Sequence, residues 1–185
     1  IANIGAGRSD VSSISLGRSV VGKSIKTAGN SFSEAIIKYI KNTHNINIGY
    51  QTAENVKKTI GCAFPMEKIT SMNISGCDAT SGLPRFISIN SEEIRECLIS
   101  SVSEISDLIK TVIIDTPPEL ISDITDDGIL ITGGGAMLYG LDMYLKNELG
   151  LKVFVTKNMQ SCVIDGIGSE LSKLDLAEVQ GGKFY

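Results

Sequence analysis

The chain has 185 residues with a formal net charge of −4, and 42% of its residues are hydrophobic and 21% charged. These values are typical of a soluble, folded domain and exclude a disordered tail or a fibrous repeat. The acidic balance disfavours a nucleic-acid partner, because such partners are attracted by a cationic surface. No apolar run reaches the roughly 20 residues that span a bilayer, and the opening residues predict no export signal.

The first 30 residues predict an antiparallel meander of three short strands joined by glycine turns. These strands cover residues 1–4, 11–16 and 19–25.

Two helices are predicted next. Ser31 and Glu34 match a capping box at the start of the first, and apolar spacing predicts the second over residues 52–60. The alternating pattern of residues 66–89 predicts a hairpin.

Asn90 is predicted to cap the longest helix, because Glu93 completes a capping box and the apolar residues behind it keep a period near 3.6. Those apolar residues are Ile94, Leu98, Val102, Ile105, Leu108, Ile109 and Val112. Thr116 is predicted to cap a further helix with proline in its first turn. The remainder alternates in the order strand 128–132, glycine turn 133–135, helix 137–149, strand 152–156 and helix 161–174.

The pattern as a whole predicts an α/β fold. The strand–helix–strand unit near the end implies a parallel crossover, whereas the opening meander is antiparallel, so we expect a mixed sheet flanked by helices. Residues 30–93 then form an insertion, a small α+β subdomain. The chain starts directly in a strand without methionine, from which we expect it to be part of a longer protein.

The cysteines and the lone histidine predict neither a metal site nor a Ser-His-Asp hydrolase. The four cysteines form no C-x-x-C pair, and only His44 is available to join them as an imidazole ligand. Zinc binding is therefore not expected, and the cysteines are predicted to be free thiols. His44 lies among asparagines just past a helical pattern, which favours a solvated helix end over a general base.

Two glycine clusters end two of the predicted strands, and their backbone amides are candidates for a phosphate site. Residues 5–7 turn a strand into its antiparallel neighbour, and residues 133–135 precede a helix expected to begin at Ala136 or Met137. Glycine lets successive N–H groups form a concave nest for an anion, and a helix N-terminus adds partial positive charge. Neither cluster matches the dinucleotide fingerprint or the P-loop, so ordinary tight turns are the alternative.

Several segments, in order along the chain, resemble the MreB family of bacterial actin-like filament proteins. They are IGAGRSDV (4–11), SEAIIKYI (33–40), IGYQTAENVKKTIG (48–61), SGLPR (81–85), SEEIRE (91–96), TPPEL (116–120) and LITGGGAMLYGLD (130–142). The resemblance covers essentially the whole chain and implies an actin-like, ribonuclease H-like fold. It also implies the second half of such a protein. Subdomain IIA would cover 1–29 and 94–160, subdomain IIB 30–93, and a C-terminal helix and tail returning to domain I 161–185.

The resemblance further implies a nucleotide site made of a hairpin at the phosphates, a helix at the nucleoside and a turn at the adenosine. The matching residues are Gly5, Ala6, Gly7 and Arg8 in the hairpin, Glu54, Asn55, Val56 and Lys57 in the helix, and Gly133, Gly134, Gly135, Ala136 and Met137 in the turn. Glu54 and Lys57 share one helix face, so both can reach one ligand. An ordinary intrahelical ion pair is the alternative.

The phosphate hairpin departs from the family pattern at Asn3, Ala6, Arg8 and Ser9. Asn3 stands where the family has the carboxylate that holds the hydration shell of Mg²⁺, and a neutral amide is a weaker partner for that ion. Arg8 replaces a threonine near the γ-phosphate, where it can neutralise charge but cannot orient water. A solvated turn residue is the alternative for Arg8. Asp10 remains as a carboxylate, so we assign no catalytic residue and no metal ligand and expect weak or absent ATPase activity.

The resemblance implies a cytoplasmic cytoskeletal protein beneath the inner membrane that maintains bacterial cell shape. Such a protein binds ATP or ADP with Mg²⁺ between two domains and polymerises with itself and with paralogous filament proteins. This chain would carry half of the nucleotide site, and that half alone is not required to bind a nucleotide. Membrane attachment would use parts of the protein outside this chain. One alternative is a monomeric ATPase, sugar-kinase-like or chaperone-like, that transfers phosphoryl groups. Another is a nucleotide sensor without ATPase activity that copolymerises with a more active paralogue.

Overall fold

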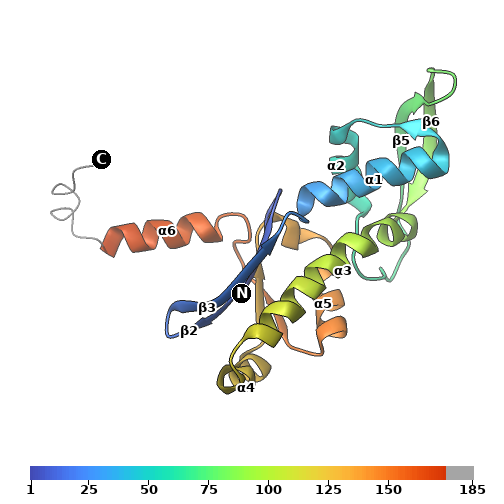
Figure 1. Ribbon diagram of the computed structural model, residues 1–185. Helices are drawn as coiled ribbons and strands as arrows, with labels where there is room; N and C mark the ends of the chain where they lie inside the picture. The colour runs from blue at the N-terminus through green and yellow to red at the C-terminus, as the bar shows by residue number, and fades with distance from the viewer. Residues whose placement is uncertain (174–185) are drawn as a thin grey trace.

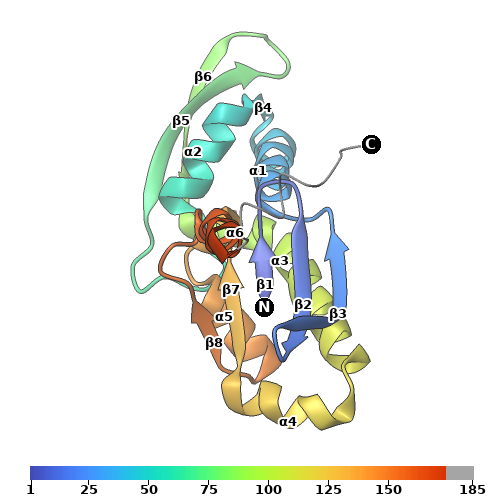
Figure 2. The ribbon, with the colours of Figure 1, turned by 90° about the vertical axis from the view of Figure 1, so that its left-hand side faces the viewer.

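The main sheet has five strands and is mixed, as the sequence predicts. The computed structural model describes residues 1–173. In sheet order the strands are β3 (Arg18–Ile25), β2 (Ser9–Ser15), β1 (Ala2–Ile4), β7 (Ile129–Thr132) and β8 (Val153–Val155). β1, β2 and β3 form the predicted antiparallel meander, while β7 runs parallel to both β1 and β8. Figure 2 shows β1 and β7 side by side within this sheet.

Helix α3 (Ser91–Asp115) is the longest helix of the described residues, and it packs against β2 and β3. All the apolar residues predicted to share one of its faces, from Ile94 to Val112, are buried. Asn90 caps the helix, since its Oδ1 accepts from the N–H groups of Glu92 and Glu93 at 3.0 Å each. The predicted cap and the predicted buried face are both confirmed.

Residues 29–90 build a second, smaller layer around a three-stranded sheet. Its elements are α1 (Gly29–His44), β4 (Ile46–Asn47), α2 (Tyr50–Ile60), β5 (Ser71–Asp78) and β6 (Pro84–Asn90). β5 and β6 form the predicted hairpin, and β4 adds a short strand that the sequence pattern did not indicate. Helix α1 packs against β4, and α2 packs against β5. Figure 1 shows this layer at the upper right, with α3 running from it towards the main sheet.

The start of α1 differs from its prediction. The helix begins at Gly29, after Ala28, so the capping box expected at Ser31 and Glu34 is wrong. Ser31 is instead the third helical residue, where its Oγ accepts from the N–H of Ala28 at 3.4 Å. The side chain therefore satisfies a donor ahead of the helix rather than one inside it.

The prediction that Thr116 caps helix α4 (Pro118–Asp127) is also wrong. Thr116 ends α3, and its hydroxyl donates to the carbonyl oxygen of Val112 at 2.7 Å. That bond satisfies one of the last free carbonyl groups of α3, which is why the side chain turns back rather than forward. Pro118 occupies the first turn of α4 as predicted, because a missing N–H has no cost there.

The glycine turn after β7 does not lead directly into a helix. Gly134–Met137 form a 3-10 turn, η1, and α5 (Leu141–Leu149) begins only at Leu141. Gly140 separates the two, because its φ is +71° and Phe64 packs 2.6 Å from where its Cβ would lie. The expected helix start at Ala136 or Met137 is therefore wrong, and the first N–H groups of α5 lie away from the glycine turn.

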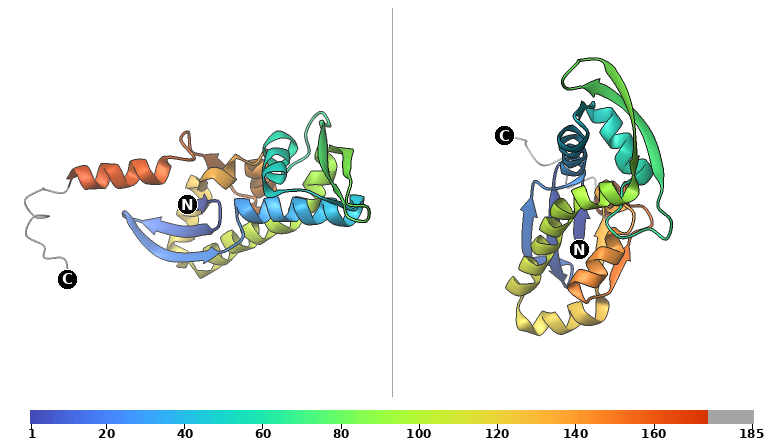
Figure 3. Two further views of the ribbon diagram at one scale, coloured as in Figure 1. Left: turned by 90° about the horizontal axis from the view of Figure 1, so that it is seen from above. Right: turned by 90° about the vertical axis from the view of Figure 1, so that its right-hand side faces the viewer.

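Helix α6 (Cys162–Lys173) extends away from the main sheet in Figures 1 and 3. Its predicted end at Leu174, and the rest of the segment up to residue 185, lie outside the described residues. Within residues 1–173, no helix combines the length and the hydropathy that a bilayer crossing requires. The four cysteines are free, as predicted, and burial raises the pKa of Cys97 to about 12.

Candidate functional site

The two glycine turns lie side by side at the end of the main sheet where β1 and β7 finish. β1 and β7 are parallel neighbours, so residues 5–7 and 133–135 leave the sheet side by side. Gly133 has a φ of +91°, and a Cβ on it would overlap the carbonyl oxygen of Ile4. A Cβ on Gly135 would lie 2.6 Å from the Cγ2 atom of Ile4. The turns pack so closely that both positions require glycine.

The first turn of α1 is hydrogen-bonded to the hairpin turn between β1 and β2. The N–H groups of Gly29 and Asn30 donate to the carbonyl oxygens of Gly5 and Ala6, at 3.1 and 2.6 Å. Within the turn, the N–H of Gly5 donates to the carbonyl oxygen of Arg8 at 2.9 Å. These bonds fix the start of α1 beside the candidate phosphate turn.

A partly buried polar network joins α2 to α1. Lys57 pairs with Glu54 on the same helix and donates to the carbonyl oxygen of Gly29 at 2.8 Å and to Ser33 Oγ at 3.0 Å. The hydroxyl of Ser33, a fully buried residue, donates to Glu54 Oε1 at 2.5 Å. The ion pair that the sequence suggested within α2 is formed, and it is tied to the first turns of α1.

A cavity of about 910 Å³ opens between the glycine turns, the start of α1 and α2. Figure 2 shows α1 and α2 above the ends of β1 and β7, the region where the cavity lies. Its lining residues are Gly5, Ala6, Gly29, Asn30, Phe32, Tyr50, Glu54, Lys57, Lys58, Thr59, Gly61, Met66, Gly134, Gly135, Met137, Leu138, Tyr139 and Gln160. Backbone amides, a few charged groups and apolar walls are the usual composition of a site for a small organic ligand.

The structure brings part of the predicted nucleotide site to this cavity. Gly5, Ala6, Glu54, Lys57, Gly134, Gly135 and Met137 line it. Val56 and Ala136 do not line the cavity, because both are buried in the hydrophobic core. Asn55 is exposed outside the lining, and its Oδ1 accepts from the hydroxyl of Thr59 at 3.4 Å. Gly7 and Gly133 also lie outside the lining, and Gly133 acts through the close packing of the two turns.

The hairpin residues that depart from the family pattern lie beside the cavity rather than in its lining, apart from Ala6. Arg8 pairs with Asp10 at 2.6 Å and donates to Ser24 Oγ at 2.7 Å, so it is held along the outer strands. Ser9 is buried and donates to a backbone carbonyl at 2.7 Å. Asn3 lies on β1, with its Oδ1 2.6 Å from the Cβ position of Gly133.

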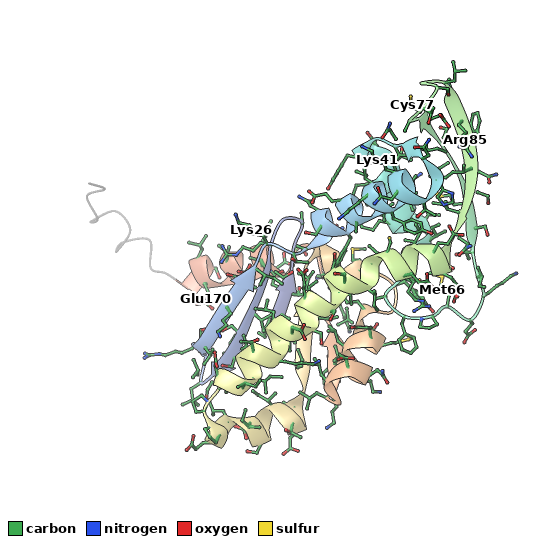
Figure 4. All side chains as sticks on the ribbon, turned by 45° about the vertical axis from the view of Figure 1, so that its right-hand side comes forward. Lys26, Lys41, Met66, Cys77, Arg85 and Glu170 are labelled. Atoms are coloured by element: carbon green, nitrogen blue, oxygen red, sulfur yellow. The ribbon has the colours of Figure 1, made fainter. Side chains whose placement is uncertain are left out.

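Sequence reasoning missed several lining residues, among them Asn30, Tyr50, Met66, Tyr139 and Gln160. Asn30 and Tyr50 stand at the starts of α1 and α2, and polar residues at helix starts near the glycine hairpin are the signal that points to them. Met66 arrives from the connection between α2 and β5, seen in Figure 4, and Gln160 from the segment before α6. Those two lie in irregular segments, where no periodic pattern marks them.

The residues present fit a nucleotide better than a protein-held metal ion. Gly5, Ala6, Gly134 and Gly135 line the cavity without side chains beyond a methyl group, and the Cβ position of Gly134 has no atom within 4 Å, so a phosphate can approach the backbone there. Within residues 1–173, no group of three or more His, Cys, Asp or Glu side chains is placed to hold a metal. Mg²⁺ at such a site would be held mainly by phosphate oxygens and water, which is its usual environment beside nucleotides.

The ionisation of Glu54 gives a pH-dependent test of the polar network. Burial alone would raise the pKa of Glu54, but hydrogen bonds from Lys57 and Ser33 outweigh it and hold the pKa below its ordinary value of 4.5. The network therefore stabilises the fold above that ordinary value and loses its effect as pH falls through the lower folded-state pKa.

We expect Glu54→Gln to flatten the loss of stability on acidification, measured by urea unfolding of the full-length protein at a series of pH values below 6. Glu34, exposed on α1, provides the matched control, and Glu34→Gln should keep the wild-type slope. An unchanged slope in Glu54→Gln would show that the network contributes nothing to acid sensitivity.

The mixed sheet, the inserted second sheet and the paired glycine turns define an actin-like protein. MreB 5 of Spiroplasma citri, in its crystal structure bound to AMPPNP, matches 98% of this chain with a TM-score of 0.92 at 40% identity, over 54% of its own length. The MamK double helical filament shares the fold alone, with a TM-score of 0.80 at 20% identity. The expected actin-like fold is confirmed.

The chain belongs to the MreB/Mbl protein family, whose model matches residues 1–179. The cell shape-determining protein Mbl of Bacillus subtilis is 43% identical over 175 residues, which are 95% of this chain and 53% of that protein. The cell shape-determining protein MreB of Escherichia coli is 36% identical over 185 residues, which are 100% of this chain and 52% of that protein. The chain therefore spans about half the length of the curated relatives it matches.

Proposed function

We propose that this chain is the second domain of an actin-like cytoskeletal protein that binds an adenine nucleotide between two domains, polymerises and maintains bacterial cell shape. The observation that carries the proposal is the cavity of about 910 Å³ where two glycine turns and the charged face of α2 converge. MreB 5 of Spiroplasma citri is bound to AMPPNP in one crystal structure and to ADP in another, which supports an adenine nucleotide as the ligand. The names of the relatives support the role in cell shape.

In this proposal the turn at residues 5–7 approaches the β- and γ-phosphates through its backbone N–H groups. The turn at 133–135, with Glu54 and Lys57 of α2, faces the nucleoside. Mg²⁺ accompanies the nucleotide through its phosphates. Hydrolysis is weak or absent, because Asn3 provides no carboxylate and Arg8 is held by Asp10 and Ser24.

We assign residues 1–29 and 94–160 to subdomain IIA and residues 30–93 to subdomain IIB. Helix α6 leads to domain I in this assignment, and its exposed apolar side chains support a partner surface there. These are Val163, Ile164, Ile167 and Leu171, which are 51 to 71% exposed. Their spacing gives one apolar stripe, as expected for a helix that packs on another element.

The two ends of the molecule expose different apolar side chains, as an open head-to-tail filament requires. At the β5–β6 hairpin, Leu83 is 65% and Phe86 78% exposed. Figure 4 shows this hairpin, marked by Cys77 and Arg85, far from the main sheet. At the opposite end, the turn between β2 and β3 leaves Leu16 fully exposed. These unlike exposed ends support self-association as the assembly mode.

Electron microscopy of the full-length protein tests this proposal. We expect filaments with AMPPNP in the wild type, and loss of filaments in Phe86→Asp or Leu16→Asp, because a charge at either end would have to be desolvated in the contact. Met143 is exposed on α5, which belongs to neither the β5–β6 hairpin nor the β2–β3 turn, so Met143→Asp should still form filaments. A wild type that binds AMPPNP but stays monomeric would contradict polymerisation and favour a kinase-like or chaperone-like relative.

The remaining assignments follow from the same proposal. The protein acts in the cytoplasm beneath the inner membrane, where it polymerises with itself and with paralogous filament proteins. Membrane attachment is assigned to parts of the protein outside this chain. Cosedimentation with a paralogue, measured with and without AMPPNP, tests the mixed filament, which should pellet with both proteins only when nucleotide is present.

A further inference from the structure

The first two backbone donors of α1 are bonded to the hairpin turn, and one side-chain donor is left beside it. The N–H groups of Gly29 and Asn30 already donate to the carbonyl oxygens of Gly5 and Ala6. The Asn30 side chain is exposed and lines the cavity next to that turn. Its Nδ2 atom lies 3.8 Å from the Cβ position of Gly7 and has no acceptor among residues 1–173. An unpaired amide therefore faces the turn from the helix side.

Tyr50 fixes the orientation of that amide. Its hydroxyl donates to Asn30 Oδ1 at 2.9 Å, across the gap between the starts of α2 and α1. An asparagine amide has an accepting end and a donating end, so a donor bound to Oδ1 leaves Nδ2 directed elsewhere. Here the free end is the one beside the hairpin turn. Both residues line the cavity, and Tyr50 keeps 47% of its surface exposed.

The lysine that is bonded to the start of α1 is already engaged. Lys57 pairs with Glu54 and donates to the carbonyl oxygen of Gly29 and to Ser33, so its ammonium hydrogens have partners within the protein. An incoming phosphate at the hairpin turn would then meet the backbone amides of the turn and the neutral Asn30 amide. A phosphate oxygen is a strong acceptor for an N–H donor.

We propose that Asn30 contacts the β-phosphate of the nucleotide and that Tyr50 is a positioning residue that aims the Asn30 amide at it. This inference rests on the proposed nucleotide site and adds to it a group that favours nucleotides with more than one phosphate. The Tyr50 hydroxyl does not touch the phosphate and acts only through Asn30. Its removal leaves the aromatic ring in the cavity wall and frees the amide to rotate.

The test measures the affinities of the full-length protein for ADP and for AMP by competition against a fluorescent ADP analogue. We expect Tyr50→Phe to weaken ADP binding by about fivefold, the typical effect of one hydrogen bond, and to leave AMP binding unchanged. Asn30→Ala should weaken ADP binding at least as much. The double variant should bind ADP no more weakly than Asn30→Ala alone, because Tyr50 acts through that amide.

A control and three results decide the outcome. Tyr144 lies on α5 outside the cavity, so Tyr144→Phe should leave both affinities at their wild-type values. Equal weakening of ADP and AMP by Tyr50→Phe would make Tyr50 a general structural residue and overturn the inference, and so would an unchanged ADP affinity. A wild type that binds neither nucleotide would instead remove the proposed function as well, so the two failures are distinguishable.

Discussion

Replacing Gly133 with alanine is expected to destabilise the protein by about 3 kcal/mol and to lower its affinity for ADP by at least about tenfold. Gly133 has a φ of +91°, where a side chain is strained, and the added Cβ would overlap the carbonyl oxygen of Ile4. It would also lie 2.6 Å from Asn3 Oδ1. To relieve this overlap, β1 and β7 would have to move apart at the ends where the two glycine turns line the cavity.

The control substitution Gly150→Ala tests the effect of a positive φ without the effect of close packing. Gly150 has a φ of +66°, but no atom lies within 4 Å of its Cβ position. Gly150→Ala should therefore cost only about 1 kcal/mol and leave ADP affinity unchanged. Urea unfolding and ADP titration of the full-length variants provide both readouts. Equal effects of the two substitutions would show that the contact between the glycine turns is unimportant.

Restoring the family residues at the phosphate hairpin is expected to raise ATP hydrolysis. We predict that the double variant Asn3→Asp, Arg8→Thr releases phosphate about tenfold or more faster than the wild type, which corresponds to about 1.4 kcal/mol of barrier. The carboxylate would order the water shell of Mg²⁺, and the hydroxyl would replace a guanidinium that Asp10 and Ser24 hold along the strands.

Single variants show which of the two changes matters. Arg8→Thr alone should leave hydrolysis slow, because the Mg²⁺ shell would still lack its carboxylate partner. Phosphate release under saturating ATP and Mg²⁺, measured on full-length protein, is the readout. Rapid hydrolysis by the wild type would contradict the expectation of weak ATPase activity and favour an active enzyme.

Local patterns predicted the elements whose determinants are local. The buried face of α3 follows from its apolar spacing. The Asn90 cap follows from Glu92 and Glu93, the residues two and three positions after it. The start of α1 depends instead on bonds from Gly29 and Asn30 to the distant hairpin turn, which no local pattern contains. The break before α5 has the same origin, because Gly140 packs against Phe64 from the inserted segment.

The candidate site was predictable where the chain carries special residue types at strand ends. The two glycine turns and the Glu54–Lys57 pair are examples, and the structure brings them to one cavity. The resemblance assigns Val56 to the site because its neighbours match the family motif, although its spacing on α2 directs it into the core. Gln160 reaches the cavity through a loop whose path depends on tertiary contacts.

The most direct test of the account is photolabelling of the full-length protein with an azido analogue of ATP, followed by mass spectrometry of the labelled peptides. We expect nucleotide-dependent labelling within residues 134–139 or 50–66, which line the cavity and which we propose face the nucleoside. Unlabelled ADP should compete for this labelling, and Gly133→Ala should weaken it at the same concentration of the analogue. Labelling confined to other peptides of this chain, or labelling that ADP does not displace, would contradict the assignment of this cavity as the nucleotide site.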